Sequence, residues 1–211
     1  MELYFSPLAC SMATRISLYE AGADARFIEI DPKVKRTPEG ADYRAINPLG
    51  LVPAIRTDAG EVLTENAATL QYVADRFPDG ALVPQAGLDR FRLQQWLCFI
   101  GTELHKAFYI PLLDSKAPDD AKKYALEQGQ NRLAYLDSYL AGRDFLLDRF
   151  SVADAYLFTV LNWSSAVAVD LARWPAVKDY YSRMRRRASV ARALAEERAL
   201  YEQQSTRHKA A

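Results

Sequence analysis

Residues 6–11 read SPLACS, and they lie between two segments of different periodicity. The segment that leads into them, Glu2 to Ser6, is short, rich in aromatic residues and bounded by Pro7, which predicts a strand. After them, apolar residues recur at helical spacing as far as Gly22, which stands where helices commonly end. The sequence therefore predicts a strand that turns directly into a helix, with Cys10 in the first turn of that helix.

This position bears on the chemistry of Cys10. A helix N-terminus presents unpaired N–H groups and the positive end of the helix dipole, which favour a thiolate and hence a reactive cysteine. The structural alternative is that Cys10 is a small buried hydrophobic residue. The other cysteine is Cys98, so no disulfide framework is expected, and with only His105 and His208 the residue types predict no metal centre.

Length and charge limit the function classes. The chain has 211 residues, enough for one large domain or two smaller ones. It carries 27 Lys and Arg against 27 Asp and Glu, so the charge balance favours neither nucleic acid nor an anionic membrane as a partner. The N-terminus leads straight into the predicted strand without a signal-peptide pattern, and no apolar run reaches membrane-spanning length. We therefore expect a cytoplasmic protein.

The first 80 residues alternate between strand and helix patterns. Residues 26–30 predict a second strand, parallel to the first, and residues 31–48 predict a long irregular connection with one helical turn around 42–45. Residues 51–57 and 61–63 predict a β-hairpin, and Thr64 then offers an N-cap for a helix over 65–77. This order is that of an α/β thioredoxin-like domain with a four-stranded mixed sheet, over residues 1–80.

Residues 81–87 predict a linker, and residues 88–211 predict an all-α C-terminal domain. A helix over 89–113 has an apolar stripe one face wide. Ser151 and Asp154 have the spacing of a capping box and predict the start of a central, nearly wholly apolar helix over 152–169. The polar tail after Glu202 is expected to fray.

Together these motifs resemble a known family. The SPLACS turn, the Val52-Pro53 pair and the Thr-Glu-Asn helix start at 64–66, followed by a helical domain, are similar to the cytosolic glutathione transferases. Residues 96–106 and 151–158 resemble the bacterial beta class, which carries cysteine at the turn. The similarity runs from Met1 to about Leu200. It implies a homodimer that uses glutathione as co-substrate, acts on a small apolar electrophile and needs no metal.

The resemblance also implies roles for single residues. Cys10 and His105 would be catalytic, Val52 before a cis proline would pair with the cysteinyl part of glutathione, Glu65 would bind its ammonium group, and Lys35 would bind its glycyl carboxylate. The start of the helix at Asn66 would hold the γ-glutamyl carboxylate. The full implied glutathione set is Cys10, Ser11, Lys35, Val52, Pro53, Glu65, Asn66, Cys98, Thr102, Glu103 and His105. The implied electrophile pocket, between the domains, contains Lys106, Phe108 and Trp163.

Each of these residues also has a plain structural interpretation. Glu65 could be an ordinary acidic residue at a helix start, His105 a buried histidine bonded to a neighbour, and Trp163 a core residue. Cys98, Thr102 and His105 are spaced at i, i+4 and i+7, which predicts that they share one helix face beside the core stripe. The resemblance to the beta class implies that this face approaches the thiol site, partly from the other subunit. The chain departs from the family pattern at Leu8, where glycine is frequent, at Phe5, where tyrosine is common, and at Cys98, usually asparagine.

The resulting hypothesis is a glutathione transferase that conjugates glutathione to apolar electrophiles. Thiol–disulfide exchange and reductive dehalogenation through Cys10 stay open as its chemistry. Ala13 occupies the second cysteine position of a C-x-x-C motif, which argues against a dithiol oxidoreductase. The alternative from another class is a non-catalytic protein of the same fold that binds a protein partner or hydrophobic ligands.

Overall fold

The computed structural model describes residues 1–210, which form two compact units. The first unit contains Met1–Leu82 and the C-terminal helix α8 (Ala188–Ala210), and the second contains Val83–Arg187. The first stretch of this unit ends at Leu82, inside the linker predicted over residues 81–87. The last helix, however, groups with the first unit because it packs along α1 (Met12–Glu20).

A four-stranded mixed sheet forms the centre of the first unit. Its strands are ordered β2-β1-β3-β4, with β1 and β2 parallel and β3 antiparallel to both of its neighbours. This confirms the parallel first pair and the hairpin. The strand bounds are β1 Glu2–Phe5, β2 Arg26–Glu29, β3 Ala54–Arg56 and β4 Val62–Thr64. The first three strands are shorter than the sequence predicts, and β4 has the predicted length but begins one residue later.

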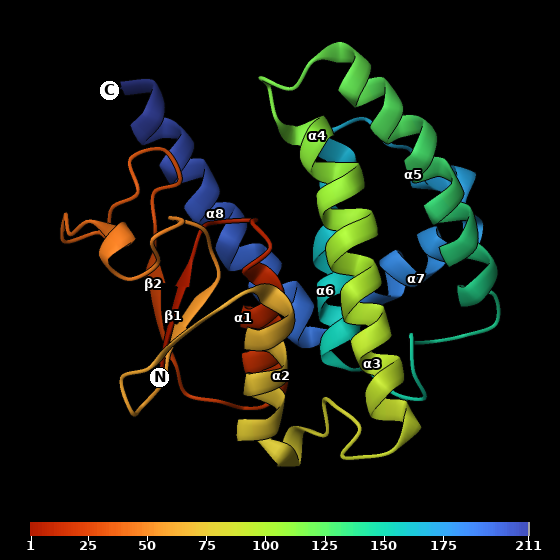
Figure 1. Cartoon of the computed structure of the whole chain (residues 1–211), viewed down its shortest axis with the longest axis horizontal. Coiled ribbons are helices and arrows are strands. Elements are labelled where there is room, and N and C mark those ends of the chain that lie inside the picture. Colours follow the sequence, from red (N-terminus) through yellow and green to blue (C-terminus); the bar gives the residue numbers. More distant parts are fainter. Residues whose placement is uncertain (211) are drawn as a thin grey trace. The chain divides into compact units, whose positions relative to one another are not determined.

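The two faces of the sheet are covered differently. On one face, Leu3 and Phe5 of β1 pack with apolar residues of α1, of α2 (Asn66–Arg76) and of α8. On the other face, Tyr4 packs against Tyr43, which belongs to the 3₁₀ turn η1 (Tyr43–Ala45) in the long connection after β2. Figure 1 shows α1 and α2 side by side on the first face. The alternation along β1 thus fixes which side receives the helices.

The polar end of α8 is ordered, so the prediction of a frayed tail is wrong. Gln204 donates to Glu29 over 3.1 Å, Arg207 pairs with the same carboxylate at 2.5 Å, and His208 Nε2 lies 2.7 Å from Asp31 Oδ2. Glu29 and Asp31 lie at the end of β2 and just beyond it. Polar contacts to the end of this strand therefore hold a segment that lacks an apolar stripe.

The second unit is helical, and its centre is α6 (Val152–Leu161), every residue of which is buried. This confirms the prediction of a central apolar helix, although the α-helix ends at Leu161 and continues as the 3₁₀ turn η4 (Asn162–Ala166). The single helix predicted over 89–113 is divided by a π-helical segment. The remaining elements are α3 Leu88–Phe99, π-helix η3 Ile100–Tyr109, α4 Ile110–Leu113, α5 Asp119–Leu140, η5 Leu171–Arg173 and α7 Pro175–Arg185, with the short η2 Pro78–Gly80 before them.

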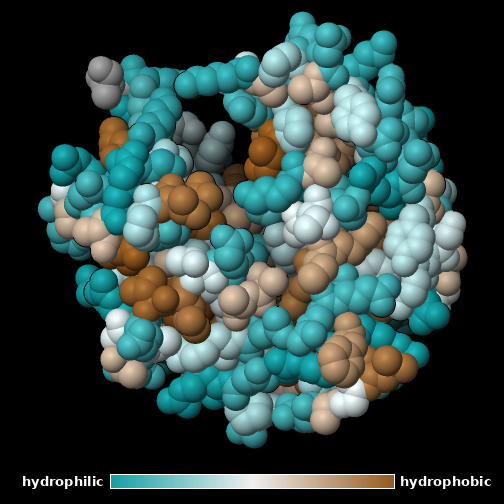
Figure 2. All heavy atoms as spheres, viewed as in Figure 1, coloured by the Kyte–Doolittle hydropathy of each residue, from teal (hydrophilic) through white to brown (hydrophobic). Residues whose placement is uncertain are grey.

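Within residues 1–210, no helix combines the length and apolar character needed to cross a bilayer. On the face of the molecule shown in Figure 2, hydrophobic residues form several separate small patches among hydrophilic ones.

The predicted capping box at the start of α6 is present and forms part of a buried network. The wholly buried Asp154 carboxylate accepts from the Ser151 N–H and hydroxyl, the Leu146 N–H and the Tyr180 hydroxyl, each over 2.9 Å. One side chain therefore joins the start of α6 to the preceding loop and to α7.

We predict that Asp154→Ala strongly destabilises the protein, because it leaves several buried donors without an acceptor at about 1–3 kcal/mol each. Urea unfolding should show a loss of about 3 kcal/mol or more. Asp170→Ala is the matched control, since the exposed Asp170 caps only the Ala172 N–H; it should cost less than about 1 kcal/mol. Equal losses in the two variants would contradict the assigned importance of the buried network.

Candidate functional site

The turn that carries Cys10 lies just before α1 and not inside it. Helix α1 begins at Met12 with Ser11 as its N-cap, so the prediction that Cys10 occupies the first helical turn is wrong by two residues. Backbone hydrogen bonds from Ala9 to Ser6 and from Met12 to Ala9 close the turn. Leu8 has φ 60°, a conformation that glycine adopts easily and leucine rarely, which explains a preference for glycine near this position.

Cys10 is half-buried and joins three segments that are distant in sequence. Its thiol donates to the Val52 carbonyl over 3.2 Å, and its own carbonyl accepts from the Asn66 side-chain amide over 3.1 Å. The turn after β1, the segment before β3 and the start of α2 therefore meet at this cysteine.

Ser11 stabilises the turn through its side chain. The buried hydroxyl donates to the Ser6 carbonyl and accepts from the Ser6 N–H, both over 3.3 Å. The hydroxyl is thus engaged within the protein, and the role of Ser11 in glutathione binding stays a prediction.

The Val52–Pro53 peptide bond is cis. Val52 precedes β3, and the adjacent Leu51 carbonyl accepts from the Tyr43 hydroxyl over 2.8 Å and from the Asn47 side chain over 2.7 Å. Tyr43 and Asn47 are buried, so their hydrogen bonds hold the backbone of this segment in place. Sequence reasoning missed both residues, because their spacing carries no motif; the Asn47-Pro48 dipeptide was the only local signal of a turn.

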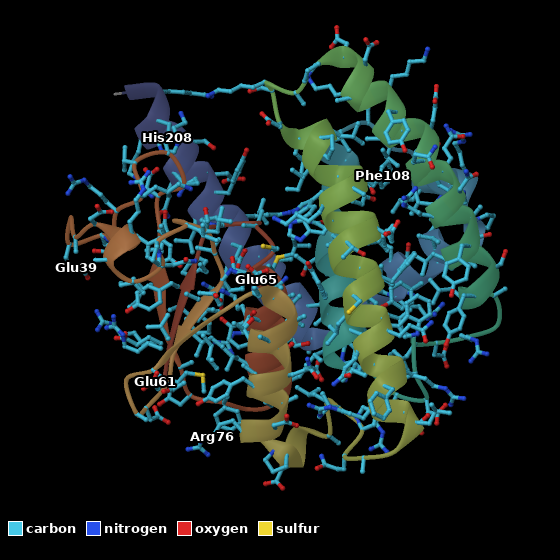
Figure 3. All side chains as sticks on the ribbon, in the orientation of Figure 1. Glu39, Glu61, Glu65, Arg76, Phe108 and His208 are labelled. Carbon is cyan, nitrogen blue, oxygen red and sulfur yellow. The ribbon has the colours of Figure 1, made fainter. Side chains whose placement is uncertain are left out.

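Glu65, and not Thr64, is the N-cap of α2. Thr64 ends β4, while Glu65 has φ 65° and ψ 126° and its carbonyl accepts from the Ala68 and Thr69 N–H groups. This backbone conformation costs a non-glycine residue about 1–3 kcal/mol, a kind of strain that clusters at functional sites. The Glu65 side chain is exposed at the start of α2 (Figure 3). The neighbouring Asn66 is buried, and its Oδ1 atom has no hydrogen-bond partner among the described residues.

Lys35 is a half-buried cation on the long connection, and its φ is 57°. Its aliphatic chain lies so close to Gly50 that a Cβ atom there would come within 3.2 Å of the Lys35 Cδ. Burial lowers the pKa of Lys35, and the charge of Arg44 lowers it further. The negative charge of an incoming carboxylate would act in the opposite direction and raise the pKa of Lys35.

His105 lies in the core of the second unit. Only 6% of its surface is exposed, its Nδ1 is 2.7 Å from the Tyr156 hydroxyl, and its ring packs edge-on to Trp163 at 5.0 Å. Burial, and secondarily the charge of Lys106, lowers its pKa to about 4. This geometry matches the plain interpretation of His105 as a buried histidine bonded to a neighbour, and its catalytic role stays a prediction.

The expected shared face of Cys98, Thr102 and His105 is not formed. Cys98 and Thr102 are exposed, and the Thr102 hydroxyl donates to the Cys98 carbonyl over 3.0 Å, whereas His105 points into the core. The π-helix η3 begins at Ile100, between Cys98 and Thr102, so the α-helical spacing does not apply across the three residues.

The other predicted residues of this region have different surroundings. Glu103 forms a two-point ion pair with Arg132, with both N–O distances at 2.7 Å, and Lys106 is exposed. Phe108 of η3 is buried against α5, where a Cβ atom at Gly129 would come within 2.2 Å of the Phe108 ring, so glycine is required there. Trp163 is buried beside His105, as its core interpretation predicts. In the part of the chain described, no group of three or more His, Cys, Asp or Glu residues could hold a metal ion.

Comparison with known proteins decides the family. Residues 9–76 match the model of the N-terminal domain of glutathione S-transferase, and residues 96–188 match that of its C-terminal domain. The chain belongs to the glutathione S-transferase family. It is 40% identical over 199 residues to the glutathione S-transferase GstA of Escherichia coli O157:H7, an alignment that covers 93% of this chain and 98% of that protein.

Solved structures of similar proteins agree with the assignment of this chain to the glutathione S-transferase family. A sphingomonad glutathione S-transferase complexed with glutathione is 45% identical with a TM-score of 0.89, and covers 93% of this chain and 98% of its own. The bacterial beta-class glutathione S-transferase of Sphingomonas chungbukensis is 41% identical, also with a TM-score of 0.89 and the same coverage. The resemblance to the bacterial beta class and the predicted fold class are thereby confirmed.

We predict that the His105 imidazole stays neutral from about pH 5.5 to about pH 8, because its lowered pKa lies below that range. The unfolded chain binds the proton more readily, so the contribution of His105 to stability is complete above the ordinary histidine pKa and is lost as the pH falls toward 4. Nitrogen chemical shifts of the imidazole, assigned with a His208→Gln variant, measure this directly. A titration midpoint above about pH 6 would contradict the buried neutral state.

Proposed function

We propose that the transferase binds glutathione on its first unit, around Cys10, and transfers the glutathione sulfur to an apolar electrophile. The observation that carries this proposal is the pair of hydrogen bonds that joins Cys10 to Val52 and to Asn66. They bring together the three segments that a short charged peptide with a thiol would need: a cysteine turn, a backbone edge and a helix start.

The charges and backbone groups of the site suit the parts of glutathione. The unpaired N–H groups at the start of α2 can hold the γ-glutamyl carboxylate, and the exposed Glu65 can pair with its ammonium group. The backbone of Val52 and Pro53 offers an edge for the cysteinyl part, and Lys35 offers a positive charge for the glycyl carboxylate.

In conjugation, the thiolate of glutathione attacks the electrophilic carbon, a carbon–sulfur bond forms and the leaving group departs with its electron pair. Cys10 would hold the thiolate by turning its S–H from the Val52 carbonyl to the ligand sulfur. In thiol–disulfide exchange, the alternative chemistry, the Cys10 thiolate attacks one sulfur of a glutathione disulfide. The disulfide bond breaks, and one glutathione thiolate leaves. In both reactions, glutathione would bind at the same place, next to Cys10.

We further propose that the transferase acts as a homodimer. The exposed Cys98 and Thr102, with Glu103, would reach glutathione bound by the partner subunit, and Lys106 would meet the electrophile. Phe108 and Trp163 are buried, so their part in an electrophile pocket would be to shape it from within the helical core. His105, kept neutral by burial, would support this wall through Tyr156.

We predict that Glu65→Ala lowers the affinity for glutathione by about tenfold to a hundredfold without unfolding the protein. The variant removes the one carboxylate proposed to face the ligand ammonium, and this charge-assisted contact is worth about 1.5–3 kcal/mol. Titration calorimetry with glutathione measures the loss. Glu61→Ala is the matched control, because Glu61 is also exposed and lies at the other end of β4 (Figure 3). The affinity of the Glu61→Ala variant for glutathione should equal that of the wild type. Near-normal affinity of Glu65→Ala would refute the assignment.

We predict that oxidised glutathione adds one glutathionyl group to the transferase, at Cys10, and that Cys10→Ala prevents this. Peptide mass spectrometry locates the adduct, and the exposed Cys98 is the internal control because it lies within a helix, away from free N–H groups. An adduct found equally at Cys98 and Cys10 would show that mere exposure decides the reaction.

Conjugation should respond differently to Cys10→Ala. There Cys10 supplies a hydrogen bond to the ligand sulfur, worth about 1.5–3 kcal/mol, so the rate should fall about tenfold to a hundredfold. If both conjugation and disulfide exchange survive unchanged, Cys10 only packs. A chain that also fails to bind immobilised glutathione would support the non-catalytic alternative.

A further inference from the structure

Glu197 of α8 is a carboxylate with 0% exposure, in the first unit but outside the proposed glutathione site. It faces the turn that carries Cys10, because its Oε2 accepts from the Leu8 N–H over 2.7 Å. A buried carboxylate is costly unless its surroundings compensate it. The contacts of Glu197 therefore need an explanation beyond packing.

Its partner is Arg15 of α1, a guanidinium that is also buried. Arg15 Nε lies 3.0 Å from Glu197 Oε1, so the two buried side chains form an ion pair. The Phe5 and Phe27 rings enclose Arg15, each 4.2 Å from its centre. Burial raises the pKa of Glu197 to about 7, and the charge of Arg15 and the Leu8 N–H oppose this rise.

The other carboxylate on Arg15 provides a contrast. Glu196, the preceding residue of α8, pairs with Arg15 at 3.0 Å from the partly exposed side and contacts Tyr19 and Arg192. Glu196 thus shares the helix and the arginine with Glu197. Of the two carboxylates, Glu197 is the one that accepts the hydrogen bond from the Leu8 N–H in the Cys10 turn.

The turn needs such a contact because Leu8 has a positive φ. A leucine keeps this conformation only where its surroundings fix it. The bond to Glu197 joins the Leu8 N–H to a helix that begins 180 residues later, so it fixes the turn from outside.

We infer that Glu197 is a positioning residue for Cys10: by binding the Leu8 N–H while paired with Arg15, it sets the direction from which the Cys10 sulfur meets a bound glutathione or its disulfide. This inference rests on the proposed function. Its physical basis is that a displacement of about 1 Å in a reacting group lowers a rate by about a hundredfold when the reaction depends on orientation.

Two reactions of the same thiol separate positioning from reactivity. Oxidised glutathione must lie in the site to react with Cys10, whereas iodoacetamide is small and needs no fixed orientation. Both rates depend on the Cys10 thiolate, so their ratio cancels its ionisation. Mass spectrometry of the Cys10 peptide gives both rates on the full chain, and circular dichroism with urea unfolding checks that each variant is folded.

We expect Glu197→Ala to lower this ratio about tenfold or more. Glu197→Gln keeps an amide oxygen that can accept from the Leu8 N–H, so it should recover a large part of the ratio. Glu196→Ala, which disturbs Arg15 but not the turn, should stay within about twofold of the wild type. Hydrogen exchange of the Leu8 amide should be faster in Glu197→Ala than in Glu196→Ala.

A ratio that is unchanged in the folded Glu197 variants would overturn the inference, and so would an equal fall in Glu196→Ala. A failure of the proposed function has a different signature. In that case the wild-type chain would react with oxidised glutathione no faster, relative to iodoacetamide, than with cystamine, a disulfide that lacks the γ-glutamyl and glycyl groups. If the wild type prefers oxidised glutathione and Glu197→Ala keeps this preference, the positioning role is wrong and the proposed function still stands.

Discussion

The antiparallel pairing of β3 with β1 and with β4 determines where the site forms. Tyr4 near the end of β1 lies opposite Ala54 at the start of β3, and Ala54 lies opposite Thr64 at the end of β4. The residues after β1, before β3 and after β4 must therefore emerge at one edge of the sheet. These are the Cys10 turn, the Val52–Pro53 segment and the start of α2, and the hydrogen bonds of Cys10 join them.

Among the described residues, three of the five non-glycine residues with a positive φ belong to this region, and the other two are Ala81 and Ala168. Leu8, Lys35 and Glu65 each have a positive φ although none is glycine, and each belongs to the turn or to the proposed glutathione residues. Such conformations persist where the surrounding structure fixes them, here through Glu197 for Leu8 and through hydrogen bonds at both ends of Lys35. These strained conformations lower the stability of the first unit, and they fix the positions of the groups that would contact the ligand.

Local patterns in the sequence were sufficient for the sheet, the hairpin, the central apolar helix and the capping box at Ser151 and Asp154. They failed where a distant contact or an unusual helix decides the outcome. The end of α8 has no apolar stripe and is held by Glu29 and Asp31, far away in sequence. The π-helix changes the spacing on which the face of Cys98, Thr102 and His105 was predicted. Likewise, nothing in the adjacent pair Glu196 and Glu197 indicates which of them is buried. The site residues of the first unit were found through motifs, whereas Tyr43, Asn47 and Glu197 have none.

The central claim is that glutathione lies at the edge of the sheet where these three segments meet. The most direct test is a titration of the ¹⁵N-labelled protein with S-methylglutathione, which keeps the charges of glutathione but cannot react. The account predicts that the largest amide shifts occur at Cys10 and Ser11, at Val52, and at Glu65 and Asn66. Shifts that are absent from these amides, or that centre on another part of the chain, would contradict it.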